Sequence, residues 1–218
     1  MAKKINFGTI TDEALEMVST YNVAYKTGKS IRDYHSGKIA AAEKAREAVL
    51  EKREKAISDG MAVDEAIRKY SCLKENQAIE VAKSNKKDAV SALNKKFATG
   101  RALVTGDMYL AYVSYMSSGN ISDFVKAITE FLATLGINTP DVATAKFAEI
   151  MAAKVSGDVK ASGKALKDGN YTQNKREQGF KDMFVRSFLQ ILVKEKGVLD
   201  ENEETFELTR HDFSKDAE

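Results

Sequence analysis

The sequence predicts an all-α fold: a multi-helix bundle of seven to nine helices with a charged helical hairpin in its N-terminal half. Two observations carry this prediction. Pro140 is the only proline in 218 residues, whereas alanine occurs 28 times; proline breaks helices and alanine has the highest helix propensity. Apolar residues also recur at spacings of three and four along most of the chain, which is the period of a helix.

Thr11 is expected to cap a first helix that ends near Gly28, because glycine is common just past a helix end. A short helical turn should follow and end at Gly37. Residues 38–59 are mainly Ala, Lys, Glu and Arg with a narrow apolar stripe, which predicts a long helix with a charged back. Two arginines share the heptad seam of this segment, so its coiled-coil pattern is weak. The seam residues are Ile39, Ala42, Arg46, Val49, Arg53 and Ala56.

A second helical segment is expected after Gly60 and should run to Ala98. One straight helix would place Lys86 among apolar residues, so a break at Ser84–Asn85 is predicted, with Asn85 as a new cap. The segments before and after Gly60 should then pair as an antiparallel helical hairpin.

The core is expected in residues 103–135, where only four of 33 residues are charged and apolar residues recur at helical spacing. Ser122 should cap a helix that ends at Gly136. A further helix should start at Pro140, with Thr139 as its cap. Residues 178–194 are apolar nearly all round, which predicts a central, buried helix.

Charge is distributed unevenly along the chain. Residues 195–218 hold nine acidic and three basic side chains, so this end is net −6 and the preceding part is net +8. The acidic end is the only stretch with the composition of a disordered polyelectrolyte. We expect N-terminal helices with the hairpin in 1–100, an apolar bundle in 101–197 and an acidic tail in 198–218, or a single compact domain. The split favours a polyanionic partner for the body, or the tail folding back on it.

The compartment is predicted from two features. Cys72 is the only cysteine, which rules out an intrachain disulfide and favours a reducing environment; we interpret it as a small buried apolar residue. The N-terminus lacks the apolar stretch of a secretory signal, and no run approaches the roughly 18 apolar residues of a membrane span. A cytoplasmic protein without membrane association is expected.

No motif points to catalysis, a cofactor or a metal. His35 and His211 are the only histidines, which with one cysteine are too few for the usual zinc sites. We interpret His35 as a surface or capping residue. Three tyrosines at helical spacing would suit base stacking but lie in the most apolar block, so they are expected in the core. They are Tyr109, Tyr112 and Tyr115.

The most specific candidate for binding is a basic segment. Between Lys154 and Arg176 there are six basic and two acidic residues. If Asp158 starts a short helix, three of the lysines form one stripe that can follow a phosphate backbone. The alternative is the solvated face of an amphipathic helix. The candidate residues for a polyanion or partner are Lys160, Lys164, Lys167, Lys175 and Arg176.

Three classes of function fit these patterns. A non-catalytic interaction protein, acting as adaptor, assembly component or inhibitor on a protein partner, is favoured because it requires only surfaces. The alternative is a nucleic-acid-associated helical protein that uses the basic segment. An enzyme with an unfamiliar arrangement of residues is the third class. A compact accessory protein without markers of metabolism would suit a virus or mobile element. The sequence leaves the oligomeric state open.

Overall fold

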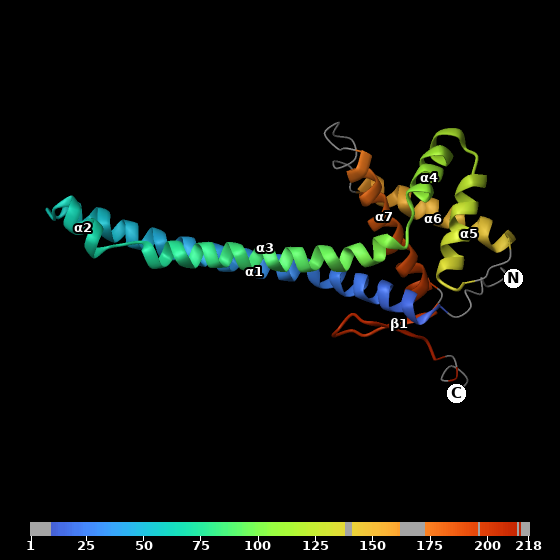
Figure 1. Ribbon diagram of the computed structural model, residues 1–218, viewed down its shortest axis with the longest axis horizontal. Coiled ribbons are helices and arrows are strands. Elements are labelled where there is room, and N and C mark those ends of the chain that lie inside the picture. The colour runs from blue at the N-terminus through green and yellow to red at the C-terminus, as the bar shows by residue number, and fades with distance from the viewer. Residues whose placement is uncertain (1–9, 138–140, 162–172, 196, 213, 215–218) are drawn as a thin grey trace. The chain divides into compact units, whose positions relative to one another are not determined.

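The computed structural model describes residues 10–137, 141–161, 173–195, 197–212 and 214. These residues form seven α-helices, one π-helical turn and one two-stranded sheet, which confirms the predicted all-α, multi-helix fold (Figure 1). The helices are α1 (Asp12–Ser58), α2 (Val63–Lys69), α3 (Leu73–Ala102), α4 (Gly106–Ser118), α5 (Ser122–Thr134), α6 (Asp141–Ala161) and α7 (Gln173–Gln190). The π-helical turn η1 (Ile191–Glu195) continues α7, and strands β1 (Leu199–Glu201) and β2 (Leu208–Arg210) follow.

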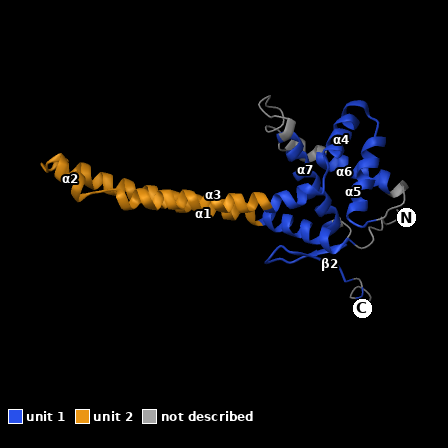
Figure 2. Ribbon diagram, viewed as in Figure 1, with its two compact units in different colours: residues 1–26, 96–218 blue, residues 27–95 orange. Residues whose placement is uncertain are grey.

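The chain divides into two compact units, coloured separately in Figure 2. The hairpin unit comprises residues 27–95, and the bundle unit comprises residues 1–26 and 96–218. Helices α1 and α3 each contribute residues to both units. The division expected into residues 1–100, 101–197 and 198–218 stays a prediction.

The hairpin unit contains the predicted charged helical hairpin. Its parts of α1 and α3 lie side by side and are joined through α2 (Figure 1). Gly60 ends α1 in the left-handed conformation, with φ +96°. The Gly60 N–H donates to the Ile57 carbonyl at 3.0 Å, and the Met61 N–H donates to the Ala56 carbonyl at 2.9 Å. This glycine therefore provides the stop signal that was expected of it.

Helix α1 is continuous, so the helix ends predicted at Gly28 and Gly37 are wrong. Neither glycine has the positive φ of a helix stop; among the described glycines, only Gly60, Gly119, Gly136 and Gly197 do. A glycine inside a helix costs about 1 kcal/mol relative to alanine. The Ala, Lys, Glu and Arg residues that follow are good helix formers and offset that cost.

Helix α3 is continuous as well, so the break predicted at Ser84–Asn85 is wrong. Lys86 does lie on the inner face of the helix and is half-buried. Its Nζ donates to Ser36 Oγ at 3.0 Å, because the long apolar stem carries the charge to the edge of the contact. The apolar residues of the predicted heptad seam are also half-buried: Ile39, Ala42, Val49 and Ala56.

The core of the bundle unit lies where the sequence predicted it. Helix α5 buries its apolar face, and α7 with η1 is buried on most sides, as expected of a central helix. The ring of Phe131 on α5 meets Phe184 and Phe188 on α7 edge-on, with centroid separations of 5.1 and 4.9 Å. Helix α6 contributes Phe147, whose ring is 6.1 Å from that of Phe188. Edge-to-face aromatic pairs at such separations add to the free energy gained by burial.

Two predicted boundaries in the bundle unit need correction. Helix α5 begins at Ser122, so Ser122 is its first residue and not its cap; Asn120 Oδ1 instead accepts from the Ser122 N–H at 3.0 Å. Asp158 lies inside α6 and does not start a helix. The alanine-rich run before it continues through Gly157 at a tolerable cost in propensity. The stop at Gly136 is confirmed by its φ of +77°, and Thr139 and Pro140 lie outside the described residues.

Part of the acidic end of the chain is folded. Strands β1 and β2 pair antiparallel, with Leu199 opposite Arg210 and Glu201 opposite Leu208. Leu199 and Leu208 are buried in the core of the bundle unit. Arg210 donates to the Ile10 carbonyl at 2.7 Å and pairs with the Asp12 carboxylate. The burial of Leu199 and Leu208, together with the polar contacts of Arg210, explains why this mainly acidic end of the chain forms a hairpin.

Candidate partner-binding surfaces

The structure leaves the predicted basic stripe untested. Lys160 is in the last turn of α6, and Lys164 and Lys167 lie outside the described residues. Lys175 and Arg176 are exposed in the first turn of α7. The structure therefore describes only some of the residues of the stripe, and their alignment along one helix face stays a prediction.

Three side chains that were considered as candidates for catalysis or metal binding make contacts within the fold. They are His35, His211 and Cys72. His35 packs edge-on against Tyr34, with ring centroids 5.3 Å apart, and His211 Nδ1 lies 2.8 Å from Asp200 Oδ1. Cys72 is buried, as expected. Across the described part of the chain, no three His, Cys, Asp or Glu side chains are grouped so that they could hold a metal ion.

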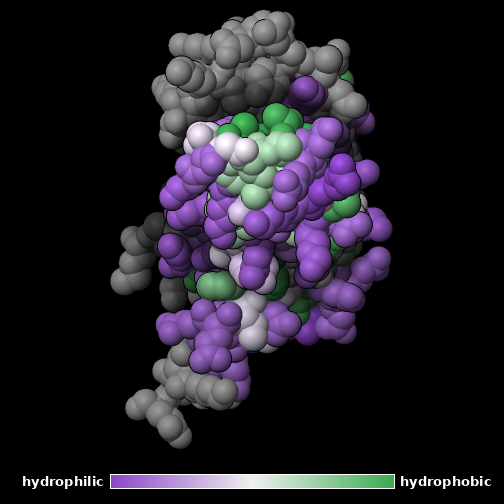
Figure 3. All heavy atoms as spheres, turned by 90° about the vertical axis from the view of Figure 1, so that its left-hand side faces the viewer, coloured by the Kyte–Doolittle hydropathy of each residue, from purple (hydrophilic) through white to green (hydrophobic). Residues whose placement is uncertain are grey.

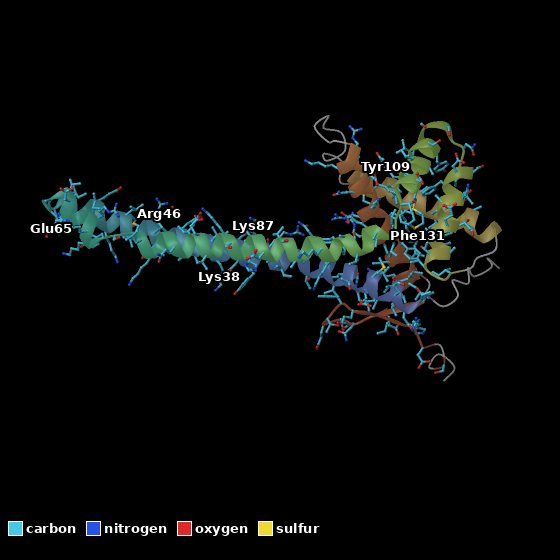
Figure 4. All side chains as sticks on the ribbon, viewed as in Figure 1. Lys38, Arg46, Glu65, Lys87, Tyr109 and Phe131 are labelled. Atoms are coloured by element: carbon cyan, nitrogen blue, oxygen red, sulfur yellow. The ribbon has the colours of Figure 1, made fainter. Side chains whose placement is uncertain are left out.

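The predicted core position of the tyrosine series is confirmed. Tyr112 is buried, and Tyr109 and Tyr115 are half-buried against the core. The Tyr109 ring is 5.4 Å from Phe180, and the Tyr115 ring stacks on Phe124 at 6.3 Å. Figure 4 shows Tyr109 and Phe131 among the helices of the bundle unit. These rings stabilise the core and present no open platform for bases.

Large apolar side chains gather on the surface at the closed end of the hairpin. Val63, Ile67 and Leu73 are exposed to 55%, 47% and 71%. We call these three residues, with the hollow beside them, the hairpin-end surface. Figure 3 faces this end of the hairpin and shows hydrophobic side chains bordered by hydrophilic ones. An isolated exposed apolar residue needs no explanation, whereas a group of them is typical of an interaction site.

A hollow of about 240 Å³ opens between Ile67 and Leu73. Its apolar wall includes Leu50 and Cys72, and its polar wall includes Arg46 and Arg53. The local sequence creates this opening because α2 has only seven residues, about two turns, and the chain re-enters a helix at Leu73. Ile67 therefore lies in the last turn of α2 and Leu73 at the start of α3.

The two arginines of the hollow differ in their contacts. Arg53 donates twice to the Tyr70 carbonyl, at 3.2 and 2.7 Å, and its Nη2 lies 3.4 Å from Cys72 Sγ. It therefore fixes the turn between α2 and α3. Arg46 is exposed and has no hydrogen-bond or ion-pair partner among the described residues. Like Lys38 and Lys87, it projects from the hairpin (Figure 4), so its charge is available to an acidic group.

A second exposed apolar group lies on α4 in the bundle unit. Leu110, Val113 and Met116 recur every three residues along one side of the helix and are all exposed. On the same helix, Met108 and Tyr112 are buried in the core. Sequence reasoning assigned this whole block to the core, because apolar residues surround α4 and periodicity alone cannot show which side remains uncovered.

Neither a protein-family model, a curated protein nor a solved structure matches this chain. In the part that the structure describes, no helix has both the length and the apolar character needed to cross a membrane.

Proposed function

We propose that this chain is a non-catalytic interaction protein whose hairpin end binds a protein partner, in the manner of an adaptor, assembly component or inhibitor. The observation that carries the proposal is the hairpin-end surface, where three large apolar side chains are exposed and two of them, Ile67 and Leu73, border a hollow with an available arginine. Apolar anchors at a pocket, with polar groups around them, are typical of protein interfaces.

The chemistry of the hollow specifies the partner. Leu73 and Ile67 would cover an apolar side chain of the partner, and that contact excludes water. Arg46 would meet a carboxylate beside it, because arginine binds carboxylates through paired hydrogen bonds. The partner should therefore present an apolar residue flanked by Asp or Glu.

Substitution at the hairpin end tests this proposal. Leu73→Glu places a charge on the proposed contact and should remove a stoichiometric partner captured by the wild-type chain from the cells that produce it. A buried unpaired charge costs several kcal/mol, which corresponds to a loss in affinity of more than about a hundredfold. The measurement is quantitative affinity capture, followed by titration of the identified partner.

Val81→Glu is the matched control, since Val81 is 60% exposed on the same helix but does not line the hollow. It should leave capture unchanged. Equal capture by wild type and Leu73→Glu, or equal loss in both variants, would contradict the proposal. Circular dichroism of each variant establishes that the helices remain formed.

Association with nucleic acid is the alternative function, supported by the exposed positions of Lys175 and Arg176 on α7. Electrostatic binding to phosphates weakens steeply as salt rises. Undetectable binding to DNA and RNA at low salt would eliminate this alternative. We further propose a reducing, cytoplasmic compartment, which the single, buried Cys72 supports.

A further inference from the structure

The bundle unit contains a pocket of about 470 Å³ between the N-terminal part of α1, the end of α7 with η1, and strand β1. Figure 1 shows β1 alongside this part of α1. All of the lining residues belong to the bundle unit. The volume falls within the range of about 300–1,000 Å³ that is typical of small-molecule sites.

The charged side chains of the pocket wall are engaged with protein groups or reach water. Lys26 Nζ lies 3.1 Å from Glu201 Oε1. Arg186 Nε donates to the Asp182 carbonyl at 3.3 Å. Lys194 is exposed, and its long stem lets the ammonium remain in water. These charges therefore require no counter-ion inside the pocket.

Asn22 contributes a buried acceptor to the pocket. The residue is 6% exposed, and its Nδ2 donates to Glu201 Oε1 at 2.7 Å and to the Phe206 carbonyl at 2.8 Å. These two acceptors fix the orientation of the amide and use both of its N–H groups. The Asn22 Oδ1 has no hydrogen-bond partner among the described residues. A donor group of a ligand would satisfy it.

Ser187 adds a hydroxyl that is also open. The residue is 3% exposed, and its Oγ has no hydrogen-bond partner among the described residues. In the part of the chain that the structure describes, the only fully buried side-chain oxygen or nitrogen without a partner is Glu75 Oε2. The Ser187 Oγ and the Asn22 Oδ1 therefore keep some accessible surface, and the pocket is the surface that both residues line.

These two open groups select for a neutral ligand that carries hydroxyl groups. Asn22 Oδ1 needs a donor, which an anionic carboxylate or phosphate group does not supply. A cationic ligand would supply donors, but the positive charges of Lys26 and Lys194 on the wall would repel it. A hydroxyl group can donate to Asn22 and can either donate or accept at Ser187.

Apolar side chains form another part of the pocket wall. Leu189 of α7 and Val193 of η1 line it together with Tyr25 of α1. The turn η1 is π-helical, and such turns are rare and occur frequently at functional sites. A sugar suits this combination, because its C–H groups can cover apolar and aromatic surface while its hydroxyl groups form hydrogen bonds.

We propose that this pocket binds a neutral mono- or disaccharide, with hydroxyl groups bonded to Asn22 Oδ1 and Ser187 Oγ and a C–H face against Leu189 and Val193. The inference is independent of the proposed partner binding, since the hairpin-end surface belongs to the hairpin unit. Failure of either test leaves the other unaffected.

NMR titration of the full chain with glucose, galactose, mannose and maltose tests the proposal. At least one of these sugars should shift the side-chain amide signals of Asn22. Ser187→Ala should weaken binding of that sugar by about threefold to tenfold, because it removes one hydrogen bond between neutral groups. Ser117→Ala is the matched control, since Ser117 is exposed on α4 and does not line the pocket. It should bind as wild type does.

Charged and aromatic analogues test the class of ligand on the wild-type chain, so this part of the experiment does not depend on a variant. Glucosamine and glucose 6-phosphate should each bind more weakly than the best neutral sugar, and so should adenosine. Three results would overturn the proposal: no shift of the Asn22 amide signals with any of the four sugars, equal binding in wild type and Ser187→Ala, or equal or tighter binding of any of the three analogues.

Discussion

A half-buried polar cluster links three helices of the bundle unit. Tyr21 Oη donates to the Asp182 carbonyl at 3.0 Å and to Asp182 Oδ1 at 3.2 Å, and Arg101 Nε donates to the same carboxylate oxygen at 2.8 Å. Burial, together with the Asp182 charge, raises the pKa of the Tyr21 hydroxyl far above its usual value, while Arg186 and Arg101 oppose the shift. The hydroxyl therefore stabilises the fold as a neutral donor.

Replacing this hydroxyl should give a pH-dependent loss of stability. Tyr21→Phe should lower the free energy of unfolding by about 1 kcal/mol at pH 7, the usual net contribution of a buried hydrogen bond. The pKa of the Tyr21 hydroxyl is higher in the folded than in the unfolded chain. The stability that this hydroxyl contributes is therefore fully present below about pH 10, the ordinary pKa of tyrosine, and is lost as the pH rises above that value. The difference between the two proteins should therefore narrow to near zero by about pH 10.5, as measured by urea unfolding at both pH values.

Tyr115→Phe is the control for this experiment, because the Tyr115 hydroxyl has no hydrogen-bond partner among the described residues. It should change stability little at either pH. A Tyr21→Phe deficit that stays constant, or grows, between pH 7 and 10.5 would contradict the assignment.

Gly100 shows what sequence reasoning missed at the residue scale. A Cβ at this position would lie 2.5 Å from Tyr21 Cδ2, so glycine is needed for the close approach of α3 to Tyr21. The sequence suggested only a boundary between segments near Gly100. A glycine that permits packing and a glycine that ends a helix look the same without knowledge of the neighbouring helix.

Glycines inside and at the end of α1 should respond in opposite directions. Gly37 is helical and has open space where a Cβ would lie, whereas Gly60 has a φ of +96°. Gly37→Ala should raise the free energy of unfolding by about 0.5–1 kcal/mol. Gly60→Ala should lower it by about 1 kcal/mol, because alanine is strained at positive φ. Chemical denaturation of both variants measures the pair, and an equal sign for both would refute the assignment of Gly37 to a regular helix.

The positions of helices that depend on many residues were predicted correctly, whereas the helix breaks that depend on a single residue were not. The central position of 178–194 followed from apolar residues all round the helix. The breaks expected at Gly28 and Ser84–Asn85 depended on single residues, and the propensity and packing of the whole helix outweighed them. The two three-residue strands were not predicted, because such short strands have too little period to recognise.

The candidate sites were harder to predict than the fold, because their residues are distant in sequence. Asn22 and Glu201 are hydrogen-bonded although they are 179 residues apart in the sequence. No rule of residue spacing could have connected them. The hairpin-end surface was missed for another reason: Val63 and Leu73 are ordinary apolar residues whose exposure depends on how α2 turns the chain.

For the whole molecule, the principal core cluster and the hairpin unit share no buried residue. None of the buried residues in the principal core cluster belongs to residues 27–95. Replacing 27–95 with a short, flexible Gly/Ser linker between Lys26 and Lys96 should therefore leave the bundle unit folded, with one cooperative thermal transition. The shortened chain should no longer capture the partner of the hairpin end. Calorimetry and affinity capture measure these outcomes; loss of the cooperative transition would show that the bundle unit requires the hairpin for its stability.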